Sequence, residues 1–274
     1  MSAKLTDAHL DELEAMGYVI VPHYYTGAHL EEMQAAQRRV LQTWDEVKDD
    51  PPPQRAILTE FPSSEIVLLR GIVDHQAWAF ARKWFDTEHI QFRAGCMIAR
   101  YPGFKGGGVG SDASGLHIDN GNNSLLPLSE THRAFGQLVF WVHLEDVDED
   151  QAPLRLLAKE YEQDMSKCEP FVCKGGALCI FTNYTLHSAS DYLRKDGQRF
   201  TWGFGLGRAD HYWEGFRHYT DKGRHPTFRE FIGTLTAKER EVFRFPPAGH
   251  PYYTPQTLAA LEEQYPGWNA RGEY

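Results

Sequence analysis

Three side chains in this sequence have the types and spacing of a metal-binding site. His117 and Asp119 are separated by one residue, and His187 follows further along the chain. Two imidazoles and one carboxylate are the ligand set of non-haem Fe(II) sites, where three ligands on one face leave positions open for oxygen and a co-substrate. Residues two apart in an extended strand point to the same side, so His117 and Asp119 could hold one ion. The pattern predicts an iron site.

An arginine and a glycine-rich strand follow the second histidine. Arg199 lies twelve residues after His187, and its guanidinium is a fixed, charged fork that suits a carboxylate. Within 199–207 the even positions are large and apolar, whereas the odd positions are this arginine, Thr201 and three glycines. Such a bare face packs a core poorly unless a small molecule fills the space above it. We therefore expect Arg199 and Thr201 to bind the end carboxylate of a dicarboxylate co-substrate. A surface salt bridge is the alternative for Arg199.

The elements that must position these residues are a run of short strands between helical segments. Before this run, apolar spacing and glycine or proline breaks predict helices over 6–16, 27–48 and 75–86, and strands over 18–21 and 66–69. Within the run they predict strands over 94–101, 115–119, 137–144, 154–158, 170–173, 177–182 and 199–207. After it the chain is helical, with a capping box at Thr236 and Glu239 and a helix start at Thr254 and Pro255.

This order of elements predicts a mainly β fold with flanking helices, formed as a single domain over residues 1–274. Residues 1–90 would form an N-terminal helical cover, 91–208 the β core and 209–274 a C-terminal helical extension. A chain of this length is long enough for one large domain, because all-β barrels of similar size often fold as one unit.

Composition argues against several classes of protein. The formal net charge is −10, which disfavours nucleic-acid binding because that function needs a basic surface. No stretch approaches the roughly 18 apolar residues of a membrane span, and the first residues lack the apolar core of a signal peptide. The four cysteines have no metal-binding pair spacing. We expect a cytoplasmic protein whose partner is a small molecule.

Two further features lie close to the expected site. The glycine-rich segment 102–110 directly precedes the metal motif, and we interpret it as a mobile flap. A phosphate cradle is the alternative, but no strand-to-helix context supports it. His143 lies on the strand over 137–144 and could line the pocket, although a hydrogen-bonded core histidine is the favoured interpretation.

The sequence resembles the phytanoyl-CoA dioxygenase family of Fe(II)/2-oxoglutarate-dependent oxygenases. The similarity lies in the segment from Leu10 to Pro22 and in Arg100-Tyr101-Pro102-Gly103, which precedes His117-Ile118-Asp119. It also lies in the order in which 175–181, His187 and Arg199 follow one another. It implies a double-stranded β-helix, the jelly-roll or cupin-like fold. It also implies that the iron ligands are His117, Asp119 and His187. Arg199 would anchor 2-oxoglutarate, with Thr201 as its hydroxyl partner. Arg100 and Gln137 would contact the co-substrate or the substrate.

The activity that this resemblance implies is a dioxygenase that uses Fe(II), 2-oxoglutarate and O2. Such an enzyme hydroxylates an unactivated C–H bond of a small-molecule metabolite and releases succinate and CO2. Asp119 argues against halogenation, because related halogenases have a small residue at this position. Desaturation, epoxidation and ring closure use the same ligands. The chain departs from the family pattern at 150–153, so the substrates of the family do not carry over.

Two interpretations outside this class stay open. A cupin-like metal-dependent isomerase or hydrolase would use Arg199 to bind an anionic substrate directly. A non-catalytic barrel that binds a small molecule would retain the pocket without the reaction. Neither the substrate nor the oligomeric state follows from the sequence.

Overall fold

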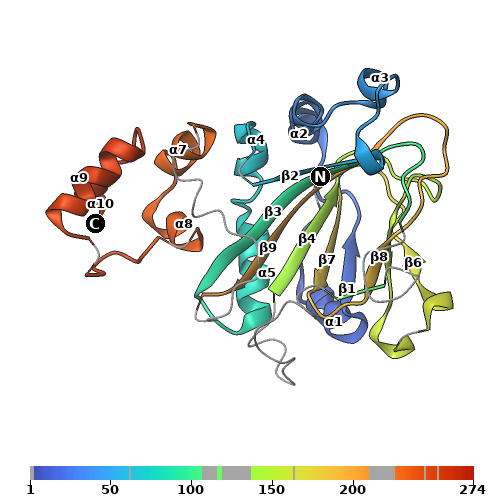
Figure 1. The fold of residues 1–274 in the computed structure, drawn as a ribbon. Coiled ribbons are helices and arrows are strands. Elements are labelled where there is room, and N and C mark those ends of the chain that lie inside the picture. The colour runs from blue at the N-terminus through green and yellow to red at the C-terminus, as the bar shows by residue number, and fades with distance from the viewer. Residues whose placement is uncertain are drawn as a thin grey trace.

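Two antiparallel sheets form the centre of the molecule (Figure 1). The computed structural model describes residues 3–61, 63–106, 116–118, 137–162, 164–209, 226–243, 245–251 and 253–274. The larger sheet has six strands in the order β1 (Tyr18–Val21), β7 (Ala177–Thr182), β4 (Gln137–His143), β9 (Arg199–Arg208), β3 (Ile90–Arg100) and β2 (Ala56–Glu60). The smaller sheet has three strands in the order β6 (Glu169–Pro170), β5 (Leu154–Leu156) and β8 (His187–Ala189).

Helices flank this β centre along the chain. Those before β3 are α1 (Asp7–Met16), α2 (Gly27–Val40), α3 (Trp44–Val47), α4 (Ile66–Arg70) and α5 (His75–Phe85). Those after β9 are α7 (Pro226–Gly233), α8 (Ala237–Val242), α9 (Pro255–Gln264) and α10 (Ala270–Glu273). The prediction of a mainly β fold with flanking helices is confirmed. Among the described residues, no helix combines the length and the apolar character that crossing a membrane requires.

The alternation along β9 divides the larger sheet into a core face and an open face. Its even residues Phe200, Trp202, Phe204 and Leu206 are buried in the main hydrophobic core, together with Trp78 of α5. Burying each large apolar side chain contributes roughly 1.5–3 kcal/mol, which fixes the register of this strand. Because side chains alternate along a strand, the arginine, threonine and glycines at the odd positions face the other way. The predicted division of 199–207 into two faces is confirmed.

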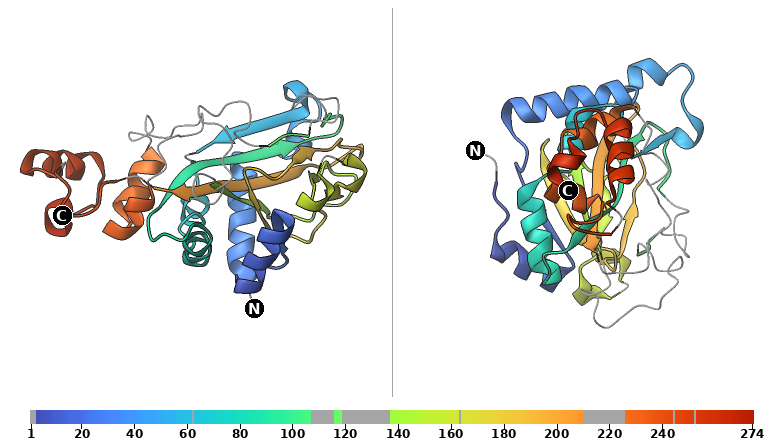
Figure 2. Two further views of the ribbon diagram at one scale, coloured as in Figure 1. Left: turned by 90° about the horizontal axis from the view of Figure 1, so that it is seen from below. Right: turned by 90° about the vertical axis from the view of Figure 1, so that its left-hand side faces the viewer.

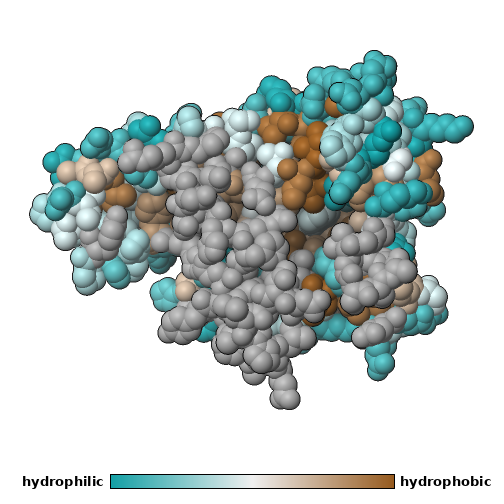
Figure 3. Space-filling model, viewed as in Figure 1, coloured by the Kyte–Doolittle hydropathy of each residue, from teal (hydrophilic) through white to brown (hydrophobic). Residues whose placement is uncertain are grey.

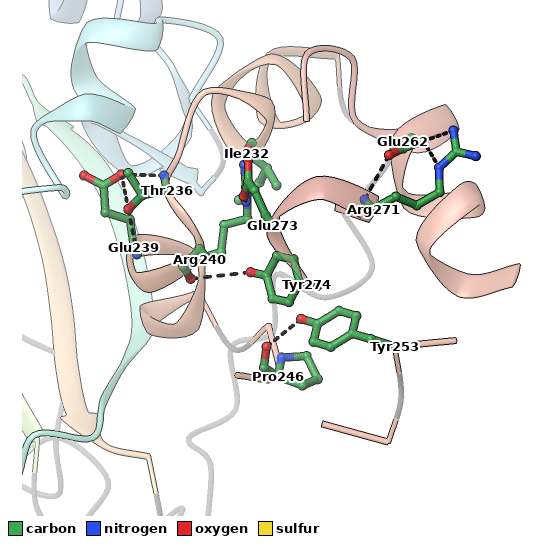
Figure 4. Close-up of polar contacts among 11 residues, drawn as sticks. Ile232, Thr236, Glu239, Arg240, Pro246, Tyr253, Glu262, Arg271, Glu273 and Tyr274 are labelled. Atoms are coloured by element: carbon green, nitrogen blue, oxygen red, sulfur yellow. Dashed lines mark hydrogen bonds and ion pairs between the residues drawn. The ribbon is translucent and has the colours of Figure 1, made fainter. Parts of the chain in front are cut away.

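The C-terminal helices continue the core beyond one end of the larger sheet (Figure 2). Thr236 caps α8, and its hydroxyl and the Glu239 carboxylate make the predicted reciprocal hydrogen bonds (Figure 4). Arg240 is almost fully buried, with its guanidinium 4.0 Å from the ring centroid of Trp268 and ion-paired with Glu273. These contacts join α8 to α10 in a buried cluster.

Several predicted elements differ from the structure. The strand predicted over 115–119 is an isolated bridge at His117 within the described residues 116–118, and the strand predicted over 170–173 is β6, Glu169–Pro170. The apolar run at 66–69 forms helix α4, because four apolar residues in a row fit a buried helical turn as well as a strand. The following Gly71 lets this turn approach the core, since a Cβ at that position would lie 2.7 Å from the Trp202 ring. The helix over 27–48 breaks at Leu41, which adopts an extended conformation and is fully buried before Thr43 caps α3.

Candidate functional site

A pocket of about 320 Å³ lies between the two sheets, on the open face of β9. Strands β3, β4, β7 and β9 of the larger sheet supply most of its wall, and β5 and β8 of the smaller sheet, with Leu58 and His117, supply the rest. Its polar lining comprises Arg93, Arg100, Arg199, Gln137, His117 and His187. Its rim includes Leu58 of β2, which is 49% exposed, and Figure 3 shows hydrophobic surface over β2 and β3.

The glycines of β9 leave one wall of this pocket without side chains. Gly203 and Gly205 both line it, and no side chain rises from either position. A Cβ on Gly203 would lie 3.2 Å from the Phe140 carbonyl oxygen, so even a methyl group is tight there. A Cβ on Gly205 would find its nearest neighbour at 3.5 Å, an ordinary contact. The glycine face therefore borders ligand-sized space, as the alternation along this strand predicts.

The fold brings the two predicted histidine ligands together. His117 and His187 form an isolated antiparallel bridge, in which each backbone N–H donates to the carbonyl oxygen of the other at 3.0 Å. Their ring centroids are 4.4 Å apart, and both side chains line the pocket. This pairing places two imidazoles where a single ion could contact both.

The surroundings of His187 fix which ring nitrogen can bind a metal. Its Nδ1 lies 2.9 Å from the carbonyl oxygen of Thr185. A carbonyl oxygen only accepts hydrogen bonds, so Nδ1 carries the proton of the neutral ring and the lone pair is left on Nε2. The ring also packs against Phe181, with centroids 5.0 Å apart. These two contacts give the tautomer and the orientation that a metal-binding histidine needs.

The third predicted ligand, Asp119, lies outside the described residues. Among the residues that the structure describes, no three His, Cys, Asp or Glu side chains form a group able to hold a metal ion. The geometry thus covers two of the three predicted ligands. The flap predicted at 102–110 is described as far as Gly106, whose N–H donates to the Asp191 carboxylate at 2.9 Å.

Arg199 is a buried cation at one end of the pocket. Its side chain is 3% exposed, and its Nε and Nη2 donate to the Ala152 carbonyl oxygen at 3.1 and 2.8 Å. Its Nη1 donates to the hydroxyl of Thr201, which lies buried beside it and does not line the pocket. No carboxylate from the described part of the chain pairs with it, so the surface salt bridge is wrong. Burial, with a smaller contribution from the charge of Arg100, lowers the pKa of Arg199 to about 9.

Arg100 lies directly opposite Arg199 in the register of β3 and β9. Its guanidinium packs 4.3 Å from the ring centroid of Phe104, and its Nη1 donates to the Ala99 carbonyl oxygen at 3.2 Å. Its buried Nε has no hydrogen-bond partner in the described part of the chain. Burial lowers the pKa of Arg100 to about 10. Two cations opposite each other repel, so this end of the pocket is prepared for an anion.

Gln137 and His143 have different positions on β4. Gln137 lines the pocket at the start of the strand, where its backbone N–H donates to the Asn183 side-chain Oδ1 at 2.8 Å and its carbonyl oxygen accepts from the Asn183 N–H at 3.1 Å. His143 is fully buried outside the pocket lining, and its Nδ1 lies 3.1 Å from the Phe200 carbonyl oxygen. Burial, with a contribution from Arg199, lowers the pKa of His143 to about 3, so the ring is neutral. The interpretation as a core histidine is confirmed.

One pocket residue, Arg93, is missed by the sequence reasoning. The register of β3 against β9 shifts between Phe92 and Ala94, and this bulge directs Arg93 over the glycine face. A cation inside an otherwise apolar strand is a signal that could have drawn attention to it. The bulge itself depends on pairing with a strand more than a hundred residues away, which no local pattern reveals.

Comparison with known proteins shows similarity in structure rather than in sequence. No family model and no curated protein matches the sequence. HygX from Streptomyces hygroscopicus, solved with nickel, 2-oxoglutarate and hygromycin B bound, has a TM-score of 0.54 and 15% identity, covering 78% of this chain and 90% of HygX. SnoK, a non-heme α-ketoglutarate-dependent carbocyclase from nogalamycin biosynthesis, has a TM-score of 0.57 and 14% identity, covering 82% and 93%.

A third similar structure is SnoN, a non-heme α-ketoglutarate-dependent epimerase from nogalamycin biosynthesis. Its TM-score is 0.57 at 14% identity, and the match covers 74% of this chain and 83% of SnoN. At this level of identity the likenesses establish the fold. The chain has the predicted jelly-roll core with flanking helices.

Proposed function

We propose that this chain is an Fe(II)- and 2-oxoglutarate-dependent dioxygenase of the phytanoyl-CoA dioxygenase family, and that it hydroxylates a small molecule. One observation carries the proposal: a pair of facing histidines shares a pocket with a buried arginine that has no described carboxylate partner. A metal site and an anion site in one cavity are what a metal-chelating dicarboxylate requires. The ligands bound to HygX, iron in one structure and nickel with 2-oxoglutarate in another, support the same cofactors here.

The ligand roles follow from the chemistry of each side chain. His117 and His187, with Asp119 as the carboxylate, would hold Fe(II). The His187 ring already has the tautomer that this role needs, because Thr185 holds its Nδ1 proton. Bound iron would supply the oxygen chemistry that oxidises the substrate C–H bond, with 2-oxoglutarate converted to succinate and CO2.

The end of the pocket at Arg199 and Arg100 would orient the 2-oxoglutarate molecule. Arg199 would bind the distal carboxylate of 2-oxoglutarate, and the hydroxyl of Thr201 fixes its guanidinium from beneath. Ala152 holds the other edge of the guanidinium through its carbonyl oxygen. Arg100, opposite in the register, adds a second positive charge at the same end. Both cations are held before any ligand arrives, so less entropy is lost on binding.

The apolar walls define where a substrate can lie. Val139, Trp141 and Phe181 line the pocket between its polar ends. Such walls exclude water from the reacting centre and leave an apolar carbon skeleton beside the histidines. Hydroxylation is the reaction we propose. The assay must identify the product, because a carbocyclase and an epimerase share this fold.

The experiment is a succinate assay with purified protein, Fe(II), 2-oxoglutarate and O2, run against a panel of metabolites. We expect one class of compound to stimulate succinate formation, and mass spectrometry to show that this compound gains one oxygen atom. A product that forms without O2 or 2-oxoglutarate would favour a metal-dependent isomerase or hydrolase. No succinate with any compound, and no binding of 2-oxoglutarate, would overturn the proposal.

A further inference from the structure

A buried histidine lies behind the arginine end of the pocket. His143 is the last residue of β4 and lies on the same face of the sheet as Val139 and Trp141, which line the pocket. Its side chain is completely buried and does not line the pocket itself. The ring packs against Phe171, with centroids 5.0 Å apart. The proposed iron and 2-oxoglutarate sites make no use of this histidine.

One ring nitrogen of His143 has hydrogen-bond partners and the other has none. Nδ1 lies 3.1 Å from the Phe200 carbonyl oxygen and 3.4 Å from the hydroxyl oxygen of Thr201. Because the carbonyl oxygen only accepts hydrogen bonds, Nδ1 carries the proton and faces both oxygens. Nε2 is buried with no hydrogen-bond partner in the described part of the chain. An imidazole with an unsatisfied nitrogen stabilises a core poorly, so its presence calls for a reason other than stability.

The hydroxyl of Thr201 links this imidazole to Arg199. Its oxygen accepts a hydrogen bond from Nη1 of Arg199, so the arginine and His143 meet at one atom. Thr201 is completely buried and lies two residues after Arg199 on β9. The χ1 rotamer of a threonine decides whether its hydroxyl or its methyl group faces a given neighbour. The N–H of His143 favours the rotamer that keeps the hydroxyl against the guanidinium.

The contacts of Arg199 leave one pair of its N–H groups for a ligand. A guanidinium has five N–H groups. Nε and Nη2 each use one on the Ala152 carbonyl oxygen, and Nη1 uses one on Thr201. One N–H is left on each Nη, and together these form the parallel pair that binds both oxygens of a carboxylate. The guanidinium would swing about the single oxygen of Ala152, so the contact with Thr201 fixes the direction of this pair.

We infer that His143 is a positioning residue for the co-substrate, because it acts through Thr201 to hold the remaining N–H pair of Arg199 towards the distal carboxylate. This inference rests on the proposed function, since it takes that carboxylate to belong to 2-oxoglutarate. The guanidinium is then oriented before the ligand arrives, so less entropy is lost on binding. The buried ring of His143 is neutral and adds a donor without a third positive charge beside Arg199 and Arg100.

The test measures how much the distal carboxylate adds to the affinity. 2-Oxoglutarate and 2-oxopentanoate share a five-carbon chain and differ only in that carboxylate. Titration calorimetry under anaerobic conditions with Fe(II) gives both Kd values, and their ratio isolates the contribution of Arg199. His143→Phe removes the donor and keeps an aromatic ring. We expect this ratio to fall about fivefold, the effect of one neutral hydrogen bond. The melting temperature should change little, because the unsatisfied Nε2 is removed together with the Nδ1 contacts.

Further variants follow the effect from His143 to Thr201. Thr201→Val removes the hydroxyl and should lower the same ratio about fivefold. The double variant should lose no more than either single one, because both changes break one path. His143→Gln retains a donor and should recover part of the ratio. His143→Leu repeats the test if the phenylalanine variant does not fold. The control is His75→Phe, which replaces an exposed histidine that pairs with Glu239 and should keep the wild-type ratio.

A second measurement needs no ligand. In 15N-labelled protein, a guanidinium held at two points rotates slowly and gives separate Nη resonances, which Arg199→Met assigns by their loss. His143→Phe should broaden or merge those of Arg199 and leave those of the buried Arg240 unchanged. An unchanged affinity ratio, unchanged Arg199 resonances, or a double variant whose loss is the product of the single losses would each overturn the inference. If neither 2-oxo acid binds the Fe(II) protein, the proposed function fails, and the resonances still decide whether His143 holds Arg199.

Discussion

Replacing Arg199 with methionine should abolish 2-oxoglutarate binding while changing the stability of the ligand-free protein little. Arg199 is 3% exposed and burial lowers its pKa to about 9 from 12.5, so keeping the charge inside costs on the order of 5 kcal/mol. Arg199→Met removes that cost. It also leaves the Ala152 carbonyl and the Thr201 hydroxyl without their donor, which costs about 1–3 kcal/mol each. The two effects nearly cancel.

The ligand-bound protein behaves differently. With 2-oxoglutarate at about 100 times its Kd, the wild type gains about 2.7 kcal/mol of stability. At roughly 2–4 °C per kcal/mol for a chain of this size, the melting temperature rises by about 5–10 °C. Loss of a charge-assisted pair worth about 3 kcal/mol weakens the affinity more than a hundredfold. The variant should then gain less than about 1 °C at the same ligand concentration.

Arg240→Met is the matched control, because Arg240 is also a buried arginine but pairs with Glu273 and does not line the pocket. Breaking this pair should cost about 3 kcal/mol and lower the melting temperature by roughly 6–12 °C. The increment produced by 2-oxoglutarate should stay the same. Differential scanning fluorimetry under anaerobic conditions with Fe(II) measures both quantities. A full 2-oxoglutarate increment in Arg199→Met would refute the assignment of this residue as the anchor.

Two further predictions concern the strand floor and the buried histidine. Gly203→Ala should cost about 1–3 kcal/mol, because its Cβ would lie 3.2 Å from a backbone carbonyl oxygen, whereas Gly205→Ala should be tolerated with its nearest contact at 3.5 Å. Urea unfolding of both variants measures this difference, and equal losses would contradict it. His143, with its pKa lowered to about 3, stays neutral in the folded protein while the unfolded chain takes up a proton below pH 6.5. Stability from this group is therefore complete above pH 6.5 and falls by up to about 1.4 kcal/mol per pH unit towards pH 3. His143→Gln should make the loss between pH 7 and pH 5 shallower in urea unfolding, and an unchanged slope would show that His143 does not titrate in this way.

The alternation of β9 made one half of the site predictable. The large apolar residues at the even positions from 200 to 206 had to face a core, so Arg199 and the glycines had to face the opposite side of the strand, where the pocket lies. His187 was predictable for a similar reason, because it follows the buried strand β7 at short range. Local patterns of this kind carry information about faces and spacing.

The other half depends on contacts between distant segments. The repulsion between Arg100 and Arg199 arises from the register of β3 and β9, which joins residues 99 positions apart. Strand β2, which supplies Leu58 to the rim, was not predicted because its sequence has no clear alternation. Arg93 enters the pocket through a bulge that exists only when the two strands pair. Register and bulges are properties of the assembled sheet, so the sequence alone does not reveal them.

The central claim is that His117, His187 and Asp119 hold an iron that 2-oxoglutarate chelates beside Arg199. The most direct test is anaerobic addition of Fe(II) and then 2-oxoglutarate, followed by visible absorption spectroscopy. We predict a weak charge-transfer band that saturates at one 2-oxoglutarate per protein and is absent in His187→Ala. A wild-type protein that gives no band, or a band unchanged in His187→Ala, would contradict the claim.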